Sequence, residues 1–219
     1  MCGRYTLKVS LPELVKTFGL HASEEPAPRF NIAPTQDVAV VTSSGERILE
    51  NFRWGLIPFW AKDRSIGSRM INARAETVGE KPAFKRLLQS RRCWVLADGF
   101  YEWKREGTRK QPMHIRLRGG RPFAFAGLWD EWRAPDGLRL RTCTIITTQA
   151  NPLLASIHDR MPVILPEYAA ETWLTPGILP AEELMPLLIP YPPEDMDAFP
   201  ISPRVNSPRN EGEDLINPA

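Results

Sequence analysis

The sequence predicts an α+β domain in which mostly antiparallel sheets curl into a barrel-like core, with short helices flanking it. Segments rich in bulky strand-forming residues follow one another in runs, without a regular alternation of strand and helix. The chain contains 22 prolines, about twice the usual frequency, which favours turns and irregular connections. Its 219 residues can bury one sizeable core, so we expect a single domain over residues 1–219 with a Pro-rich, acidic C-terminal segment from about residue 190.

The N-terminal third begins with a predicted helix over SLPELVKTFG. Ser10 is a candidate N-cap, Glu13 completes a capping box, and Gly19 provides a stop signal. VAVV and ERILENFRWG are then predicted to pair as a hairpin around the turn SSG. The stretch from Trp54 to Thr77 has no clean helical or strand periodicity, and long irregular segments in a compact domain are usually functional.

After Thr77 the sequence predicts further strands and short helices. PAFKRLLQSRR is predicted to be an amphipathic helix with a basic outer face. Strands are predicted in CWVLADGFYEW, MHIRL, PFAFAGLW and RTCTIITT, and two short helices near EYAAETWL and PAEELMPLLI follow HDRMPVIL. These runs of strands with helices at the sides complete the α+β prediction.

Composition excludes several classes of function. The first residues lack an apolar run of signal-peptide length, and no window approaches the roughly 18 apolar residues of a membrane span. We therefore expect a cytoplasmic protein without a membrane partner. The cysteines Cys2, Cys93 and Cys143 are too widely spaced for a zinc motif, and no Walker, GxGxxG or HExxH pattern occurs. We expect neither a metal nor a cofactor.

Charge is distributed unevenly along the chain. Residues 1–160 hold 26 Lys and Arg against 16 Asp and Glu, a net charge of +10, whereas residues 161–219 hold 2 against 10, a net charge of −8. An arginine-rich surface favours an anionic partner, with nucleic acid as one candidate. Scattered surface arginines neutralised by the acidic tail explain the charge alone equally well.

Cys2 is the first candidate for chemistry. Methionine is generally removed before a residue as small as cysteine, which would place an α-amine and a thiol on adjacent carbons. An α-amine has a reference pKa near 7.7–8.0, so a useful fraction is neutral and can form a Schiff base with an aldehyde. The thiol can then close a five-membered thiazolidine. In nucleic acid, the open-chain sugar of an abasic site is the aldehyde attached to phosphates, although a cysteine at position 2 is more often incidental.

Three further segments carry polar candidates. INARAET would place Asn72, Arg74 and Glu76 on one side if it were extended, although a solvated loop is the simpler interpretation. In GFYEW, Glu102 lies between aromatic residues that could desolvate it and raise its pKa, or it faces solvent. In HDRMP, His158 is a candidate proton shuttle, although a lone histidine is usually structural.

Three aromatic side chains are assigned more simply. Trp60 lies in an irregular stretch and could stack on an unpaired base. His21 follows a predicted helix end and His114 lies in a predicted strand, so both are interpreted as structural.

Taken together, these segments resemble the SOS response-associated peptidase (SRAP) family. The resemblance rests on MCGRYT, FNIAPTQ, RWGLIPFW, INARAET, CWVLADGFYEW, FAFAGLW and HDRMPVIL, in this order and approximate spacing, from Met1 to about Leu165. It implies a sensor of abasic sites in single-stranded DNA that removes its own Met1 and forms a covalent crosslink through Cys2. Such a protein would be a monomer associated with the nucleoid when bound to DNA.

The resemblance also implies roles for individual residues. Cys2 would crosslink, Asn72 would position the amine or the opened sugar, Glu102 would handle protons, and His158 would assist ring opening. The remaining residues are expected to contact DNA. Those that would hold phosphates are Arg4, Arg74 and Arg160, and those that would line the DNA path are Asn31, Pro34 and Trp60.

Two alternatives remain open from the sequence. In an N-terminal-nucleophile amide hydrolase or peptidase, Cys2 would attack a carbonyl with its own amine as base. In a binding module without chemistry, MCGRYT would simply be a buried strand. Sequence preference for DNA is expected to be weak, because contacts to phosphate carry little base information.

Overall fold

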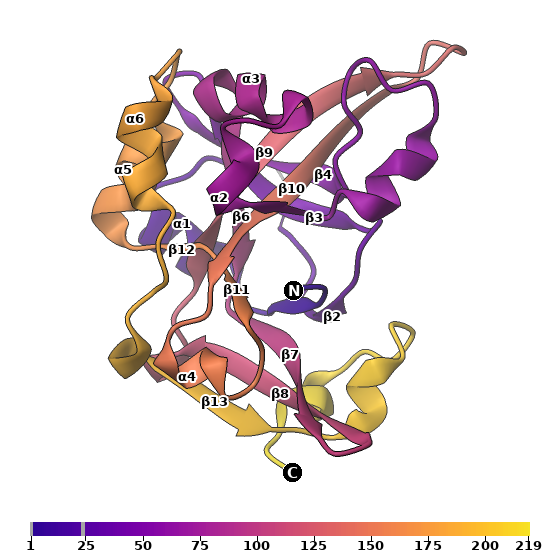
Figure 1. The fold of residues 1–219 in the computed structure, drawn as a ribbon, viewed down its shortest axis with the longest axis vertical. Coiled ribbons are helices and arrows are strands. Elements are labelled where there is room, and N and C mark those ends of the chain that lie inside the picture. The colour runs from indigo at the N-terminus through magenta and orange to yellow at the C-terminus, as the bar shows by residue number, and fades with distance from the viewer. Residues whose placement is uncertain (1, 23–24) are drawn as a thin grey trace.

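In the computed structural model, which describes residues 2–22 and 25–219, five strands close into a barrel (Figure 1). Around the ring, each strand pairs with the next, and the pairing of β10 with β9 closes it. The contact between β4 and β10 is parallel and the other four are antiparallel. In chain order the barrel strands are β3 (Asp37–Ser43), β4 (Arg47–Trp54), β6 (Arg92–Ala97), β9 (Phe123–Arg133) and β10 (Arg139–Gln149).

Three short strands extend the barrel at its edges. β5 (Asn72–Arg74) runs parallel to β10, β11 (Arg160–Pro162) runs antiparallel to β10, and β12 (Ile164–Leu165) pairs with β9. The sequences INARAET and HDRMP therefore both lie along β10. The barrel-like α+β prediction is confirmed.

A second, five-stranded sheet lies below the barrel in Figure 1, with the strand order β13-β8-β7-β1-β2. Its pairings are all antiparallel. β6 and β7 are consecutive, so the segment CWVLADGFYEW passes from the barrel into this sheet at Asp98. The strands of this sheet are β1 (Tyr5–Leu7), β2 (Arg29–Ile32), β7 (Gly99–Glu106), β8 (Arg109–Leu117) and β13 (Met196–Pro200).

Short helices surround the strands, with α4 beside β13 of the second sheet (Figure 1). They are α1 (Leu11–Phe18), α2 (Ala75–Val78), α3 (Pro82–Ser90), α4 (Pro152–Ala155), α5 (Glu167–Leu174) and α6 (Ala181–Leu184). Turns of 3-10 helix occupy Arg64–Arg69, Arg118–Gly120, Met185–Leu187, Pro193–Asp195, Pro203–Asn206 and Glu213–Ile216. None of the helices in residues 2–22 and 25–219 is long and apolar enough to cross a membrane.

The beginning of α1 differs from the predicted capping box. Ser10 occupies the N-cap position and Gly19 ends the helix in the left-handed conformation, as predicted, but the Ser10 side chain makes no capping bond. The Glu25 carboxylate instead accepts the N–H of Leu11 at 3.3 Å. Because Pro12 has no N–H, this first turn has one fewer donor to satisfy.

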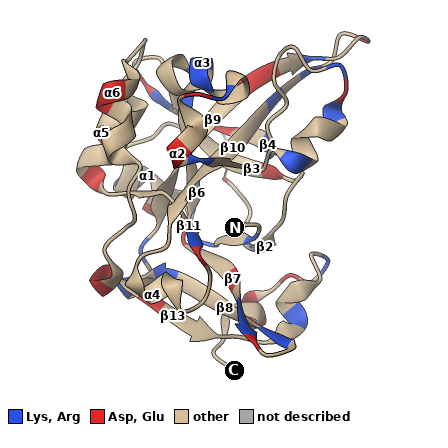
Figure 2. Cartoon of the chain, in the orientation of Figure 1, with Lys and Arg blue, Asp and Glu red and all other residues tan. Residues whose placement is uncertain are grey.

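Two hydrophobic clusters hold the fold together. The main one fills the barrel and includes the fully buried Trp54 and Trp94. A smaller one, formed by Tyr101, Ile201 and Val205, fixes the C-terminal segment against the second sheet. Figure 2 shows that acidic residues of α5 and α6 lie together on one flank of the barrel, consistent with the negative charge of the C-terminal part.

Candidate active site

Cys2 lies fully buried just before β1, the strand that joins β2 to β7. Tyr5 pairs with Phe100 across β1 and β7, and the N–H of Tyr101 donates to the Arg4 carbonyl at 2.9 Å. The N-terminal residues are thereby fixed beside β7, which carries Glu102.

Glu102 is also buried, with 2 % of its surface exposed. The sequence could not decide between burial and exposure, because burial alternates along a strand only when one face is solvated. Phe100 and Tyr101 are fully buried as well, so both faces of β7 are covered at this point.

The electrostatics link Cys2, Glu102 and His158. Burial raises the pKa of the Cys2 thiol, and the negative charge of Glu102 raises it further. Burial likewise raises the pKa of Glu102, while the charge of His158 opposes this increase. Glu102 therefore interacts with both Cys2 and His158, which come from two other parts of the chain.

Asn72 begins β5 and pairs with Ile145 of β10. Its Nδ2 donates to the Ile145 carbonyl at 3.5 Å, a long hydrogen bond, and its Oδ1 is buried without a hydrogen-bond partner among residues 2–22 and 25–219. Asn72 and Arg74 lie two residues apart on the strand and therefore on the same side. The amide oxygen is available to an incoming donor such as an amine or a hydroxyl.

An open cavity of about 640 Å³ lies beside β11 and gathers three of the predicted residues. Its lining residues are Arg74, Glu76, Thr77, Gln149, His158, Asp159 and Arg160. Arg74 is exposed, whereas the side chain of Arg160 is 14 % exposed and makes a two-pronged ion pair with Glu76 at 2.6 and 3.0 Å.

His158 is oriented by the turn that leads into β11. Its Nδ1 accepts the N–H of Arg160 at 3.0 Å, which leaves Nε2 to carry the proton of the neutral ring. Nδ1 also lies 2.8 Å from the Asp159 carboxylate, a contact that becomes an ion pair when the imidazole is protonated. A protonated Nδ1 can no longer accept the Arg160 N–H and can instead donate to the Asp159 carboxylate.

Arg4 and Asn31 occupy a different setting from the cavity residues. Asn31 is fully buried, and its Nδ2 donates to the carbonyls of Ser207 at 2.9 Å and Asn210 at 2.8 Å. Arg4 donates to Asn31 Oδ1 at 2.7 Å and to the Val205 carbonyl at 2.8 Å. In this structure both residues fasten the C-terminal segment behind Cys2, a role that the sequence analysis did not anticipate.

Pro34 and Trp60 lie outside the lining of this cavity. Pro34 is half-buried and precedes Thr35, which has a positive φ of 72°. Trp60 is 53 % exposed on a loop that two hydrogen bonds anchor. The Phe59 N–H donates to the Asp130 carboxylate at 3.0 Å, and the Trp132 indole N–H donates to the Ala61 carbonyl at 2.7 Å. This loop presents the indole of Trp60 to solvent from an anchored backbone.

INARAET is extended only as far as Arg74, because Ala75 begins α2. The predicted alternation of three residues on one side therefore ends before Glu76. The polar alternation in the sequence nevertheless singled out Glu76, whose partner Arg160 could not be inferred across 84 residues.

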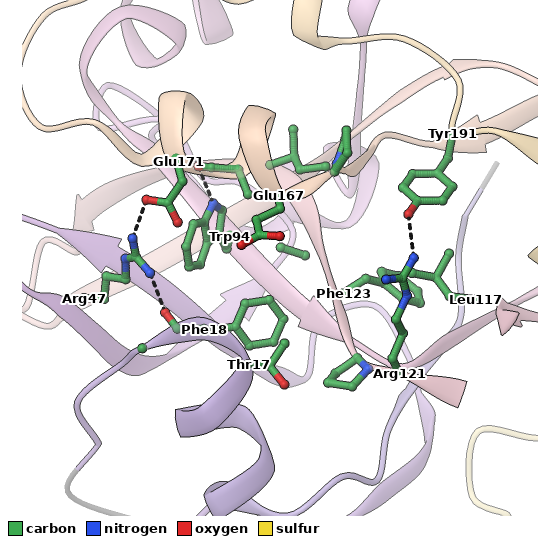
Figure 3. Close-up of a pocket in the computed structure, with 16 residues that line it drawn as sticks. Thr17, Phe18, Arg47, Trp94, Leu117, Arg121, Phe123, Glu167, Glu171 and Tyr191 are labelled. Carbon is green, nitrogen blue, oxygen red and sulfur yellow. Dashed lines mark hydrogen bonds and ion pairs between the residues drawn. The ribbon is translucent and has the colours of Figure 1, made fainter. Parts of the chain in front are cut away.

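A second pocket, of about 290 Å³, lies between α1 and α5 (Figure 3). Phe18, Trp94 and Phe123 form its buried apolar wall. At its rim, Arg47 is paired with Glu171 and donates to the Phe18 carbonyl at 2.7 Å. None of the predicted site residues lines this pocket, so it is separate from the candidate active site.

Known proteins resemble this chain over most or all of its length. "Abasic site processing protein YoqW" of Bacillus subtilis is 47 % identical over 99 % of both chains. "Abasic site processing protein HMCES" of Xenopus tropicalis is 34 % identical over 86 % of this chain and 65 % of its own. A crystal structure of a protein from Bacteroides thetaiotaomicron superposes with a TM-score of 0.90 at 30 % identity and covers both chains completely.

The family model described as "SOS response associated peptidase (SRAP)" matches residues 1–208. This match covers the candidate site from Cys2 to Arg160 and most of the C-terminal segment that Arg4 and Asn31 hold. The chain belongs to the SOS response associated peptidase (SRAP) family.

Proposed function

We propose that this protein binds single-stranded DNA at abasic sites and links itself covalently to the opened sugar through Cys2. The observation that carries the proposal is the burial of Cys2 beside Glu102, within electrostatic reach of His158. The relatives named as abasic site processing proteins support the choice of substrate. Removal of Met1, which the reaction requires, concerns a residue outside those that the structure describes.

The reaction begins at the α-amine of Cys2. The amine adds to the sugar aldehyde and the resulting carbinolamine loses water, which gives a Schiff base. The thiol then adds to the imine carbon, its sulfur forms the new C–S bond, and its proton passes to the nitrogen. The product is a thiazolidine, and no oxidant or reductant is needed.

The environment of Cys2 favours this order of steps. Because burial and Glu102 raise the pKa of the thiol, the thiolate is disfavoured and the thiol is a poor first nucleophile. The same property argues against an amide hydrolase, in which the thiolate of Cys2 would attack a carbonyl. The amine therefore attacks first and the thiol adds second.

Proton transfer is assigned to Glu102 and His158. The raised pKa of Glu102 allows its carboxyl to donate the proton with which the carbinolamine oxygen leaves as water. His158 promotes ring opening of the sugar from the cavity beside β11. The free Oδ1 of Asn72 holds the amine or a sugar hydroxyl, and the arginines of the same cavity bind the flanking phosphates.

Intact mass spectrometry tests the proposal. The purified protein should lack Met1 and should gain the mass of the strand after incubation with abasic single-stranded DNA, in a heat-resistant adduct. Cys2→Ala should retain at most a reversible imine. Cys93→Ala and Cys143→Ala are matched controls, because these cysteines are also buried and free. Both controls should crosslink normally, since neither residue carries the α-amine.

The other outcomes would each contradict the proposal or favour another function. A heat-resistant adduct on Cys2→Ala would refute the proposal. Loss of Met1 without an adduct would favour the N-terminal-nucleophile hydrolase, and an unchanged mass would favour a binding module without chemistry.

A further inference from the structure

The guanidinium of Arg160 is already engaged at the cavity. Its Nη1 and Nη2 contact the two carboxylate oxygens of Glu76 at 2.6 and 3.0 Å. Nη2 also donates to the Thr147 carbonyl at 2.7 Å, and Nε is buried without a hydrogen-bond partner in the described part of the chain. A phosphate that approaches from the cavity therefore finds the outward edge of Arg160 occupied.

A carboxylate and a phosphate use the same edge of a guanidinium. Both accept two parallel N–H groups in a forked arrangement, so they compete for one position. The Glu76 side chain is 42 % exposed and Arg160 holds its pKa below the usual range, so it stays negatively charged at neutral pH. Arg74, which lines the same cavity, lowers that pKa as well.

We propose that Glu76 is a built-in competitor of DNA phosphate for Arg160, which limits the affinity of the cavity for any single strand. This inference rests on the proposed function. A phosphate must displace the Glu76 carboxylate before Arg160 can bind it, and the displaced carboxylate repels the strand. Because contacts to phosphate carry no base information, the restraint applies to intact and abasic strands alike.

Glu76 is not needed to hold Arg160 in place. The Arg160 N–H is anchored to His158 Nδ1 at 3.0 Å, its backbone belongs to β11, and its Nη2 is held by the Thr147 carbonyl. Removing the charge of Glu76 thus leaves the arginine in position with a free edge. This separates competition from positioning, because a positioning role predicts weaker binding after the same change.

The experiment measures binding of an intact, fluorescently labelled single strand by anisotropy over a series of NaCl concentrations. An intact strand carries no aldehyde, so covalent chemistry does not contribute. Glu76→Gln should bind about two- to fivefold more tightly than the wild type, the range that releasing one exposed ion pair allows. The plot of log affinity against log salt should steepen by about 0.7, the value for one additional phosphate contact on a single strand.

A double-mutant cycle identifies the cause. In an Arg160→Gln background, Glu76→Gln should bring almost no gain, because no guanidinium remains to be released. Glu182→Gln, at an exposed position of α6, removes the same charge elsewhere and should bring a smaller gain that Arg160→Gln does not abolish.

Glu76→Gln binding equal to or weaker than the wild type, or a gain that survives in the Arg160→Gln background, would overturn the inference. A wild-type protein that does not bind the strand even at the lowest salt would instead refute the proposed function on which it rests.

Discussion

The buried N-terminal region and the exposed rim of the cavity both contain residues that the sequence assigned to DNA. In the buried region, Asn31 is fully enclosed and accepts a hydrogen bond from Arg4 at 2.7 Å. At the rim, Arg74 is exposed and Arg160 pairs with a carboxylate that a phosphate can displace. Asparagine and arginine side chains thus bond within the protein in the buried region, whereas the arginines of the rim can exchange their partners for a ligand.

The difference teaches which polar residues build a site and which ones meet the ligand. A buried polar group must be satisfied by the protein itself, because water cannot reach it. Asn31 meets this demand with Arg4 and with carbonyls of the C-terminal segment, so it stabilises the surroundings of Cys2. Arginines at the rim can exchange their hydrogen-bond partners for DNA phosphates, so we expect the DNA strand to be bound at the rim.

Glu102→Gln tests the buried side with the largest expected effect. Glutamine cannot transfer the proton, so the rate of crosslinking to abasic single-stranded DNA should fall about 10²–10⁴-fold. Quantifying the heat-resistant adduct on denaturing gels over time measures this rate. Glu106→Gln, at the exposed end of the same strand, should crosslink like the wild type.

The stability difference between the wild type and Glu102→Gln should depend on pH. Burial raises the pKa of Glu102 in the folded state above its unfolded value of about 4.3. The stability contributed by the protonated carboxyl is therefore present below about pH 4.3 and is lost as the pH rises through the folded pKa. Glu102→Gln should exceed the wild type in Tm by a margin that widens from pH 4 to pH 8, and a constant or shrinking margin would contradict a desolvated carboxylate.

Asn31→Ala tests whether the buried region is a structural hub. The change leaves the Asn210 carbonyl and a donor of Arg4 without partners and removes one of the two hydrogen bonds to the Ser207 carbonyl, so the free energy of unfolding should fall by about 2–4 kcal/mol. Urea denaturation measures this loss. Asn217→Ala, on the exposed C-terminal end, serves as the control. An equally small effect of both variants would contradict a structural role for Asn31.

Arg160→Gln and Arg4→Gln break the comparison directly. Loss of the rim arginine Arg160 should weaken binding of single-stranded DNA about tenfold and reduce the salt slope by about 0.7. Loss of the half-buried Arg4 should lower the free energy of unfolding by about 1–3 kcal/mol, because it leaves Asn31 Oδ1 without its donor and removes the shorter of two hydrogen bonds to the Val205 carbonyl. Equal effects of the two variants on DNA affinity would erase the distinction between the regions.

Local patterns in the sequence predict much of this fold. The helix that ends at Gly19 and the hairpin of β3 and β4 depend on neighbouring residues, and both form as predicted. The capping bond of Ser10 does not form, and the acceptor that the first turn does use, Glu25, lies 14 residues away from Leu11, beyond the reach of any helix-capping pattern.

The candidate site was predictable only in part. The sequence identifies residues that can act as nucleophiles or transfer protons. The burial of Glu102, however, depends on two covered faces of β7, which the hydrophobic periodicity of the sequence cannot reveal. The bond between Arg4 and Val205 spans 201 residues, and no local pattern encodes such a contact. Long-range pairing therefore decides which predicted residues become structural.

The central claim is that the amine and the thiol of Cys2 act together, and an uncleavable extension placed ahead of Cys2 tests it most directly. The extension keeps the thiol but converts the amine into a peptide bond. The proposed mechanism predicts that this variant folds and yields no heat-resistant adduct with abasic single-stranded DNA by intact mass spectrometry. An adduct at the wild-type level would show that the free amine is dispensable and would contradict the claim.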